Sequence, residues 1–377
     1  MLTKSLTQHL NVSGAFACRK VWLERSLRGT VCAMMVAFAA TASLACGFHT
    51  YLPEKTVVDW IINSDHLIVA RNSPENEFKY QALETLRGRA PSVEITQLVD
   101  SGTRQRFATN LDDASLFAFD QDQHEWKFVA YLTPEYRSVV DEVLAMAPSW
   151  NDGYDSGRFK YFEALQDHPD EVLRMLALRE IDQAPYALLR TMDVRIPTRD
   201  LLAELWTQSG YPYQPIRVLL LGLSDDETAR TELHDFVNRV ATWRWANNLG
   251  AFATALVEID GKAGVDRLES KFLSDATQPL DNLEQVVEAL AIHNDIGTQD
   301  LRTAIGASIT RLVALRPETA PLVARQFGNR QDWSQVLALE PVIRKRALPN
   351  AEDFLPVAVY VAQGRDAALQ STLKVEE

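Results

Sequence analysis

The feature that most constrains this fold is a change of hydrophobic period at Pro134. Between residues 65 and 133, short apolar runs alternate with polar residues and are separated by turn-forming residues. Beyond Pro134, apolar residues recur at helical spacing, as in Val139, Val140 and Val143, and proline itself suits the first turn of a helix. The sequence therefore predicts a β part followed by a helical part, which is an α+β fold class.

Five runs are expected as strands: 66–72, 78–88, 92–99, 115–119 and 126–132. In the run 92–99 the side chains alternate cleanly, with Val93, Ile95 and Gln97 on one face. Closely spaced short strands predict a small antiparallel β domain over residues 46–133, either an open sheet or an OB-like barrel of about five or six strands.

The order of these runs carries a resemblance. An apolar strand, a second strand that ends in "LRG" at residues 86–88 and further alternating strands resemble the netrin-type inhibitory modules, which also begin at a mature N-terminal cysteine. The paired cysteines of that family are absent here. The resemblance implies an OB-like barrel.

Residues 134–157 are predicted to form a helix and then a linker, "APSWNDGYDSG", over 147–157. The acidic residues of this linker do not have the spacing of a calcium-binding EF-hand loop. Residues 158–377 are expected to be an all-α domain. A protease is therefore predicted to cut first within 147–157 and to release a β-rich and a helical fragment.

Two stretches of the helical part resemble HEAT repeats. "DHPDEVLRMLALREI" (167–181) is similar to the second helix of a HEAT repeat, although Glu180 replaces a usual small residue. The matching positions are Pro169, Leu173, Arg174, Ala177 and Ile181. The stretch 255–273 resembles a turn between repeats, with Gly261 at the turn, and 287–315 repeats this rhythm less distinctly. The resemblance implies an α-solenoid, in which each helix pair stacks on its neighbours and the stack offers an extended surface to a protein or peptide.

The N-terminus has the pattern of a secretory signal peptide over residues 1–45. An uncharged apolar run follows a basic flank and ends in small residues. Its apolar centre is shorter than the roughly 20 residues that a membrane-spanning helix needs. The alternative is a buried core helix. A start near Val21 would give a signal peptide of ordinary length.

Cleavage after Ala45 would leave Cys46 as the first residue of the mature chain, whereas cleavage after Ala42 would not. A small residue directly before a cysteine resembles the signal of bacterial lipoproteins, although Ser43 occupies the position where that family has leucine. The two other cysteines lie in the signal peptide, so Cys46 would be an odd thiol. We expect a lipid on Cys46; an intermolecular disulfide and a free thiol are the alternatives.

The mature chain is strongly acidic. The whole chain has 38 Lys+Arg against 51 Asp+Glu, a net charge of −13, and residues 1–45 hold five of the basic residues and one acid. The remainder therefore has 33 against 50, a net charge of −17. This charge argues against non-specific binding to nucleic acid or anionic lipid. We expect a periplasmic protein that meets the membrane only through a lipid on Cys46.

Catalytic motifs are not found in the sequence. No histidine pair has zinc-site spacing, and no nucleophile elbow, phosphate-binding loop or dinucleotide fingerprint occurs. Cys46 and His49 have ligand spacing, but two ligands do not make a metal site. His234 and Asp235 are adjacent, so on a helix they point in different directions. We predict no catalytic residue, metal or cofactor.

Aromatic residues gather around a Gly- and Pro-containing loop at 205–217, where Trp206, Tyr211 and Tyr213 are candidate partner-binding residues. The alternative is that these rings are core. The sequence thus favours an exported, non-enzymatic interaction protein that binds a protein or peptide through a solenoid surface. The alternative is an envelope hydrolase with a site at the junction of the two domains.

Overall fold

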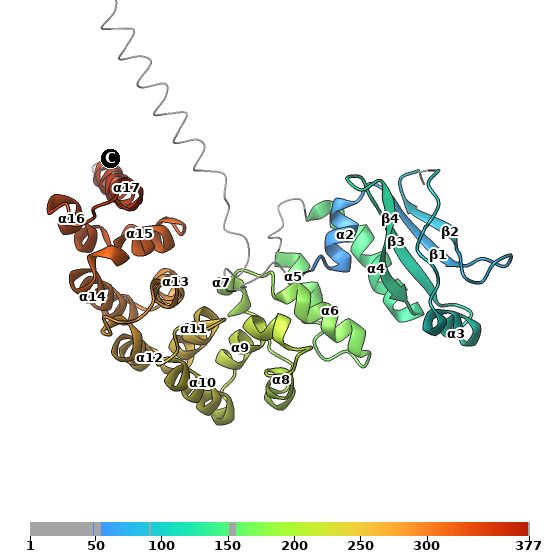
Figure 1. Cartoon of the computed structure of the whole chain (residues 1–377), viewed down its shortest axis with the longest axis horizontal. Coiled ribbons are helices and arrows are strands. Elements are labelled where there is room, and N and C mark those ends of the chain that lie inside the picture. The colour runs from blue at the N-terminus through green and yellow to red at the C-terminus, as the bar shows by residue number, and fades with distance from the viewer. Residues whose placement is uncertain (1–47, 49–53, 90–91, 151–155, 376–377) are drawn as a thin grey trace, which may run out of the picture. The chain divides into compact units, whose positions relative to one another are not determined.

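The computed structural model describes residues 48, 54–89, 92–150 and 156–375, with side chains to residue 371 (Figure 1). The signal peptide, its cleavage site and Cys46 lie outside these residues, so those expectations stay predictions. No helix in the described ranges has both the length and the apolar character to span a membrane.

Four strands form an antiparallel sheet in the order β2-β1-β3-β4 (Figure 1). They are β1 (Leu67–Asn72), β2 (Tyr80–Arg87), β3 (Ala114–Asp120) and β4 (Glu125–Leu132). The two outer strands, β2 and β4, are edges that do not pair with each other. The prediction of a small antiparallel sheet is confirmed, and the OB-like barrel of five or six strands is wrong.

Both faces of the sheet are covered, which explains why the central strands β1 and β3 are buried along most of their length. On one face, Leu67 and Leu116 join a large core that includes residues of α2 (Val57–Asn63) and α4 (Pro134–Met146). On the other face, Phe117 packs in a second, aromatic core that includes Phe107 of α3 (Ser101–Thr109). The large core continues from the sheet into the helical part.

The prediction of a strand over residues 92–99 is wrong. This segment is irregular, and only Leu98 makes a bridge, to Lys79. The indole of Trp126 donates a hydrogen bond to the carbonyl of Val93 at 3.0 Å. The segment thus lies against the aromatic core, where apolar side chains can alternate in burial without any strand partner.

The helix predicted at Pro134 is confirmed as α4. Thr133 caps it by accepting a hydrogen bond from the Tyr136 amide, and Pro134 occupies its first turn. The following segment begins with a short 3-10 helix over Ala147–Ser149, and Trp150 is buried in the large core. Residues 151–155 lie outside the described ranges.

From Ser156 onward the described chain is helical, as predicted. The longer helices are α5 (Ser156–Glu163), α6 (Glu171–Ile181), α8 (Thr198–Glu204), α9 (Gln214–Gly222), α10 (Glu227–Val240), α11 (Leu249–Asp260), α12 (Lys262–Leu268), α13 (Leu280–Ile296), α14 (Gln299–Leu315), α15 (Ala320–Gly328), α16 (Val336–Arg344) and α17 (Ala351–Val375). Short connecting helices are α7 (Tyr186–Leu189), 3-10 helices over Tyr211–Tyr213 and Pro317–Thr319, and a π-helical turn over Glu269–Leu273.

These helices pack in a regular order. Helices α9, α11, α13, α15 and α17 contact one another in series, and α12, α14 and α16 form a second series (Figure 1). Hydrogen bonds join residues between 34 and 42 positions apart along both series. Asn248, for example, donates to Gln214 at 2.9 Å, and Ser308 donates to Glu269 at 2.5 Å. Contacts therefore recur at a nearly constant separation in the chain.

A buried ion pair between two helices of the helical part also contacts α2 of the β part. Arg158 on α5 donates two hydrogen bonds to Glu180 on α6, at 2.6 and 3.0 Å, and both side chains are almost fully buried. Asp59 on α2 lies 3.5 Å from the same guanidinium. Burial raises the pKa of Glu180, and Arg158 opposes that effect. The residue that departs from the HEAT pattern thus holds α2, α5 and α6 together.

Candidate functional site

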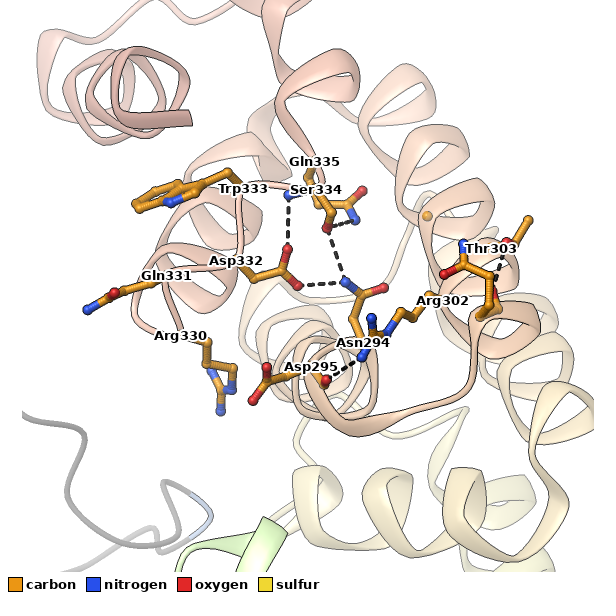
Figure 2. Close-up of a pocket in the computed structure, with 12 residues that line it drawn as sticks. Asn294, Asp295, Arg302, Thr303, Arg330, Gln331, Asp332, Trp333, Ser334 and Gln335 are labelled. Carbon is orange, nitrogen blue, oxygen red and sulfur yellow. Dashed lines mark hydrogen bonds between the residues drawn. The ribbon is translucent and has the colours of Figure 1, made fainter. Parts of the chain in front are cut away.

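A hollow of about 530 Å³ is lined almost entirely by polar side chains, and we call it the polar hollow (Figure 2). It lies between the end of α13, one face of α14 and the connection from α15 to α16. Its lining residues are Asn294, Asp295, Gln299, Arg302, Thr303, Gly306 and residues 330–335.

Asn294 is the buried centre of this hollow. Its amide nitrogen donates to a carboxylate oxygen of Asp332 at 2.6 Å and to the Ser334 hydroxyl at 3.1 Å (Figure 2). The last turn of α13 is thereby fastened to a loop 38 residues further along the chain. Arg302 reaches in from α14 and donates to the Asp295 carbonyl at 2.8 Å.

The loop over residues 330–335 is held in shape by its own side chains and by α17. Asp332 accepts a hydrogen bond from the Ser334 amide at 2.9 Å, and Gln331 adopts a positive φ of 55°. The hydroxyl of Tyr360 donates to the main-chain carbonyl of Asp332 at 2.6 Å and accepts from the main-chain N–H of Gln335 at 3.1 Å. Burial raises the pKa of Tyr360, so this hydroxyl stays protonated and able to donate.

Donors and acceptors remain available in the polar hollow. Within the described part of the chain, the amide oxygens of Asn294 and Gln335 accept no hydrogen bond. Gly306 leaves space on the α14 side of the hollow. A β-carbon at this position would lie 4.0 Å from its nearest neighbour, the side-chain nitrogen of Gln335. The hollow can therefore pair with a ligand that presents both N–H donors and oxygen acceptors.

A buried charged pair borders the hollow. Arg330 lies 3.7 Å from Glu288, and both side chains are mostly buried. Burial raises the pKa of Glu288 and lowers the pKa of Arg330, while each partner opposes the shift of the other. Arg330 also donates to the Gln326 carbonyl at 2.8 Å. This pair fixes the start of the loop and leaves Arg302 as the more accessible cation of the hollow.

Two histidines of the helical part have polar partners outside the polar hollow. His234 contacts Asp260 rather than Asp235, with 2.5 Å between its Nε2 atom and a carboxylate oxygen. His293 is buried, and its Nε2 atom lies 2.8 Å from the Thr254 carbonyl. Neither histidine lines the polar hollow.

The junction between the two parts, where a hydrolase site would lie, holds a smaller hollow of about 240 Å³. It is lined by residues of α2, α4 and α6, including Tyr136, Glu171 and Arg179, and by no histidine. Among the described residues, no three His, Cys, Asp or Glu side chains are grouped to hold a metal ion.

Trp206, the first predicted binding residue, is half exposed. Its ring stacks against Phe236 with centroids 5.6 Å apart, and its indole donates to Glu232 at 3.0 Å. Trp243 and Trp245 are also exposed. These rings remain accessible for contact with a partner.

The two predicted tyrosines differ. Tyr213 is buried, and the guanidinium of Arg179 lies 5.0 Å from the centre of its ring. Tyr211 is partly exposed, and its hydroxyl accepts a hydrogen bond from Asn247 at 2.9 Å. Tyr213 therefore serves as packing, and Trp206 and Tyr211 stay candidates for contact.

The polar hollow was missed by reasoning from the sequence. Its loop, "RQDWSQ", reads as an ordinary polar turn, and Asn294 lies in the polar run "HND" at the end of a helix. The sequence signal that could have found the hollow is the separation of 38 residues between the amide Asn294 and the polar turn at Asp332, which is about one helical repeat. No family profile, curated protein or solved structure matches this chain, so its function has to be argued from its own geometry.

Proposed function

We propose that this chain is an exported, non-enzymatic binding protein whose helical part is a HEAT-like solenoid. Its ligand is a segment of a protein or peptide, which enters the polar hollow beside Asn294. One observation carries this proposal. Two side-chain amide oxygens that accept no hydrogen bond from the described residues, those of Asn294 and Gln335, line the same hollow as the accessible guanidinium of Arg302.

Two features support a solenoid. The serial contacts of alternate helices are those of stacked helix pairs. The separation of 34 to 42 residues between hydrogen-bonded side chains is close to the roughly 40 residues of a HEAT or armadillo unit.

The chemistry of the hollow supports a peptide segment. An extended peptide presents N–H and C=O groups in alternation, and these can meet the oxygens of Asn294 and Gln335 and the guanidinium of Arg302. The net charge of −17 on the chain after residue 45 favours a partner with a basic or neutral surface. The proposal also includes export and a lipid on Cys46, which rest on the sequence alone.

Filling the hollow tests this function. Gly306→Leu places a leucine side chain in the opening, and Ala307→Leu places the same side chain at the next, exposed position of α14. We expect Gly306→Leu to abolish the capture of basic peptides from a peptide library, whereas Ala307→Leu retains it. Circular dichroism checks that both variants fold. Equal capture by both would contradict the proposed site.

A further inference from the structure

A second hollow, of about 690 Å³, lies between α6, α8 and α9. We call it the Arg217 hollow. It shares no lining residue with the polar hollow. Met175, Leu178 and Ile196 give it an apolar wall, and Asp200 and Glu171 are exposed on it.

Arg217 is the unusual group in this hollow. Its side chain lies on α9 and is only 5% exposed. Its Nε atom is buried without a hydrogen-bond partner, and its Nη2 atom has only the sulfur of Met175, 3.9 Å away. No carboxylate of the described residues lies within ion-pair distance of it, and burial lowers its pKa. The chain thus keeps this cation largely out of water with no carboxylate of the described ranges in contact with it, and Glu204 acts on it only at longer range.

Such an arrangement is costly unless something compensates it. A buried guanidinium normally forms paired hydrogen bonds to a carboxylate, because its donors form a planar fork. The other two arginines of the hollow are already engaged: Arg174 donates to the His168 carbonyl at 2.6 Å, and Arg195 to Asp193 at 3.2 Å. Arg217 is therefore the cation that is left for a ligand.

The surrounding charges limit the kind of anion. Four carboxylates line the hollow beside its three guanidinium groups, and Glu204 acts on Arg217 through its charge. A dianion such as phosphate is repelled by these acids more than a single carboxylate is. The exposed Asp200 and Glu171 favour a positive group on the same ligand, and the wall of Met175 and Leu178 favours an apolar one.

We propose that the Arg217 hollow binds a carboxylate group next to a compact apolar side chain. Two sources present this chemistry: a free apolar amino acid and the C-terminal residue of a peptide. In both, the carboxylate pairs with Arg217 and the apolar group lies against Met175. This assignment does not depend on the binding proposed for the polar hollow.

The test is calorimetric titration of the full chain with four probes: leucine, N-acetyl-Ala-Leu, the C-terminal amide of N-acetyl-Ala-Leu, and inorganic phosphate. We expect a carboxylate probe to bind and the amide to bind at least about tenfold more weakly, because it cannot form the charged pair. Binding of leucine alone assigns a free amino acid, and binding of the acetylated dipeptide assigns a chain terminus. Equal binding of acid and amide, tighter binding of phosphate, or no binding of any carboxylate probe would overturn the proposal.

Variants separate this role from a structural one. Arg217→Met should lose carboxylate binding and melt at the same temperature as the wild type or higher, because it removes an uncompensated buried charge. The matched control is Arg344→Met, at an exposed position at the end of α16, which should keep binding. Ala203→Leu narrows the hollow without touching Arg217 and should also lose binding. Retained binding in Arg217→Met, or a lower melting temperature, would count against the assignment.

Discussion

The β part and the helical part are each stabilised by a different kind of contact. In the sheet, neighbouring strands join main chain to main chain, and apolar side chains cover both faces. In the helical part, buried amides hold the connections: Gln214 donates to the Leu205 carbonyl, Asn282 to the Trp243 carbonyl and Asn294 to Asp332. Main-chain pairing places no demand on which polar residue is present, whereas an amide that holds a loop must lie at a defined distance along the chain. The regular spacing of the helical part therefore depends on its buried polar residues as well as on its apolar core.

The largest expected effect is at the buried ion pair between α5 and α6, beside α2. Arg158→Met leaves Glu180 buried without its partner, so the free energy of unfolding should fall by about 3–5 kcal/mol. Urea denaturation measures this. The double variant Arg158→Met with Glu180→Met should recover most of the loss, because it removes both charges. If the double variant is no more stable than the single one, the loss does not come from an unpaired buried Glu180.

The next effect separates the two tyrosines. Tyr213→Ala empties a buried position and should cost about 3–5 kcal/mol, whereas Tyr211→Ala removes a partly exposed ring and should cost less than about 1.5 kcal/mol. Thermal melts of the two single variants give the comparison. Similar losses would mean that the 3-10 helix over Tyr211–Tyr213 packs as a unit rather than with one ring inside and one outside.

The smallest effect is a dependence on pH. Burial lowers the pKa of His293 below 6.5, its value in the unfolded chain. Its contribution to stability is therefore complete above pH 6.5 and is lost as the pH falls, because the unfolded state then binds the extra proton. His293→Gln should flatten this loss in urea melts compared between about pH 7.5 and about pH 5.5. An equally steep loss in the variant would assign the acid sensitivity to other groups.

The sequence predicted the sheet and the helices where a single run of residues decides the structure. β1, β3 and α4 have unambiguous apolar patterns and appear where expected. The run 92–99 failed because alternation reports burial on one side and not the presence of a neighbouring strand. α3 was missed because its polar sequence buries only Phe107.

The sites were harder to predict than the elements. Trp206, Tyr211 and Tyr213 lie close in sequence, yet their burial differs, because helix packing decides which ring faces inward. Arg217 belongs to a largely apolar helix, and Asn294 lies in the polar run 293–295 at the end of α13, so neither pattern marks a site. Their roles depend on what the neighbouring helices offer them. The domain boundary at 147–157 stays a prediction for limited proteolysis.

The contacts of Asp59 on α2 with the helical part have a mechanical consequence. Thr56 and Asp59 close the first turn of this helix on each other, and Asp59 also accepts a hydrogen bond from Gln183, 124 residues further along the chain, at 3.3 Å. A force applied to the chain ahead of α2 would therefore act on α5 and on the residues after α6 through Asp59, and not on β1 alone.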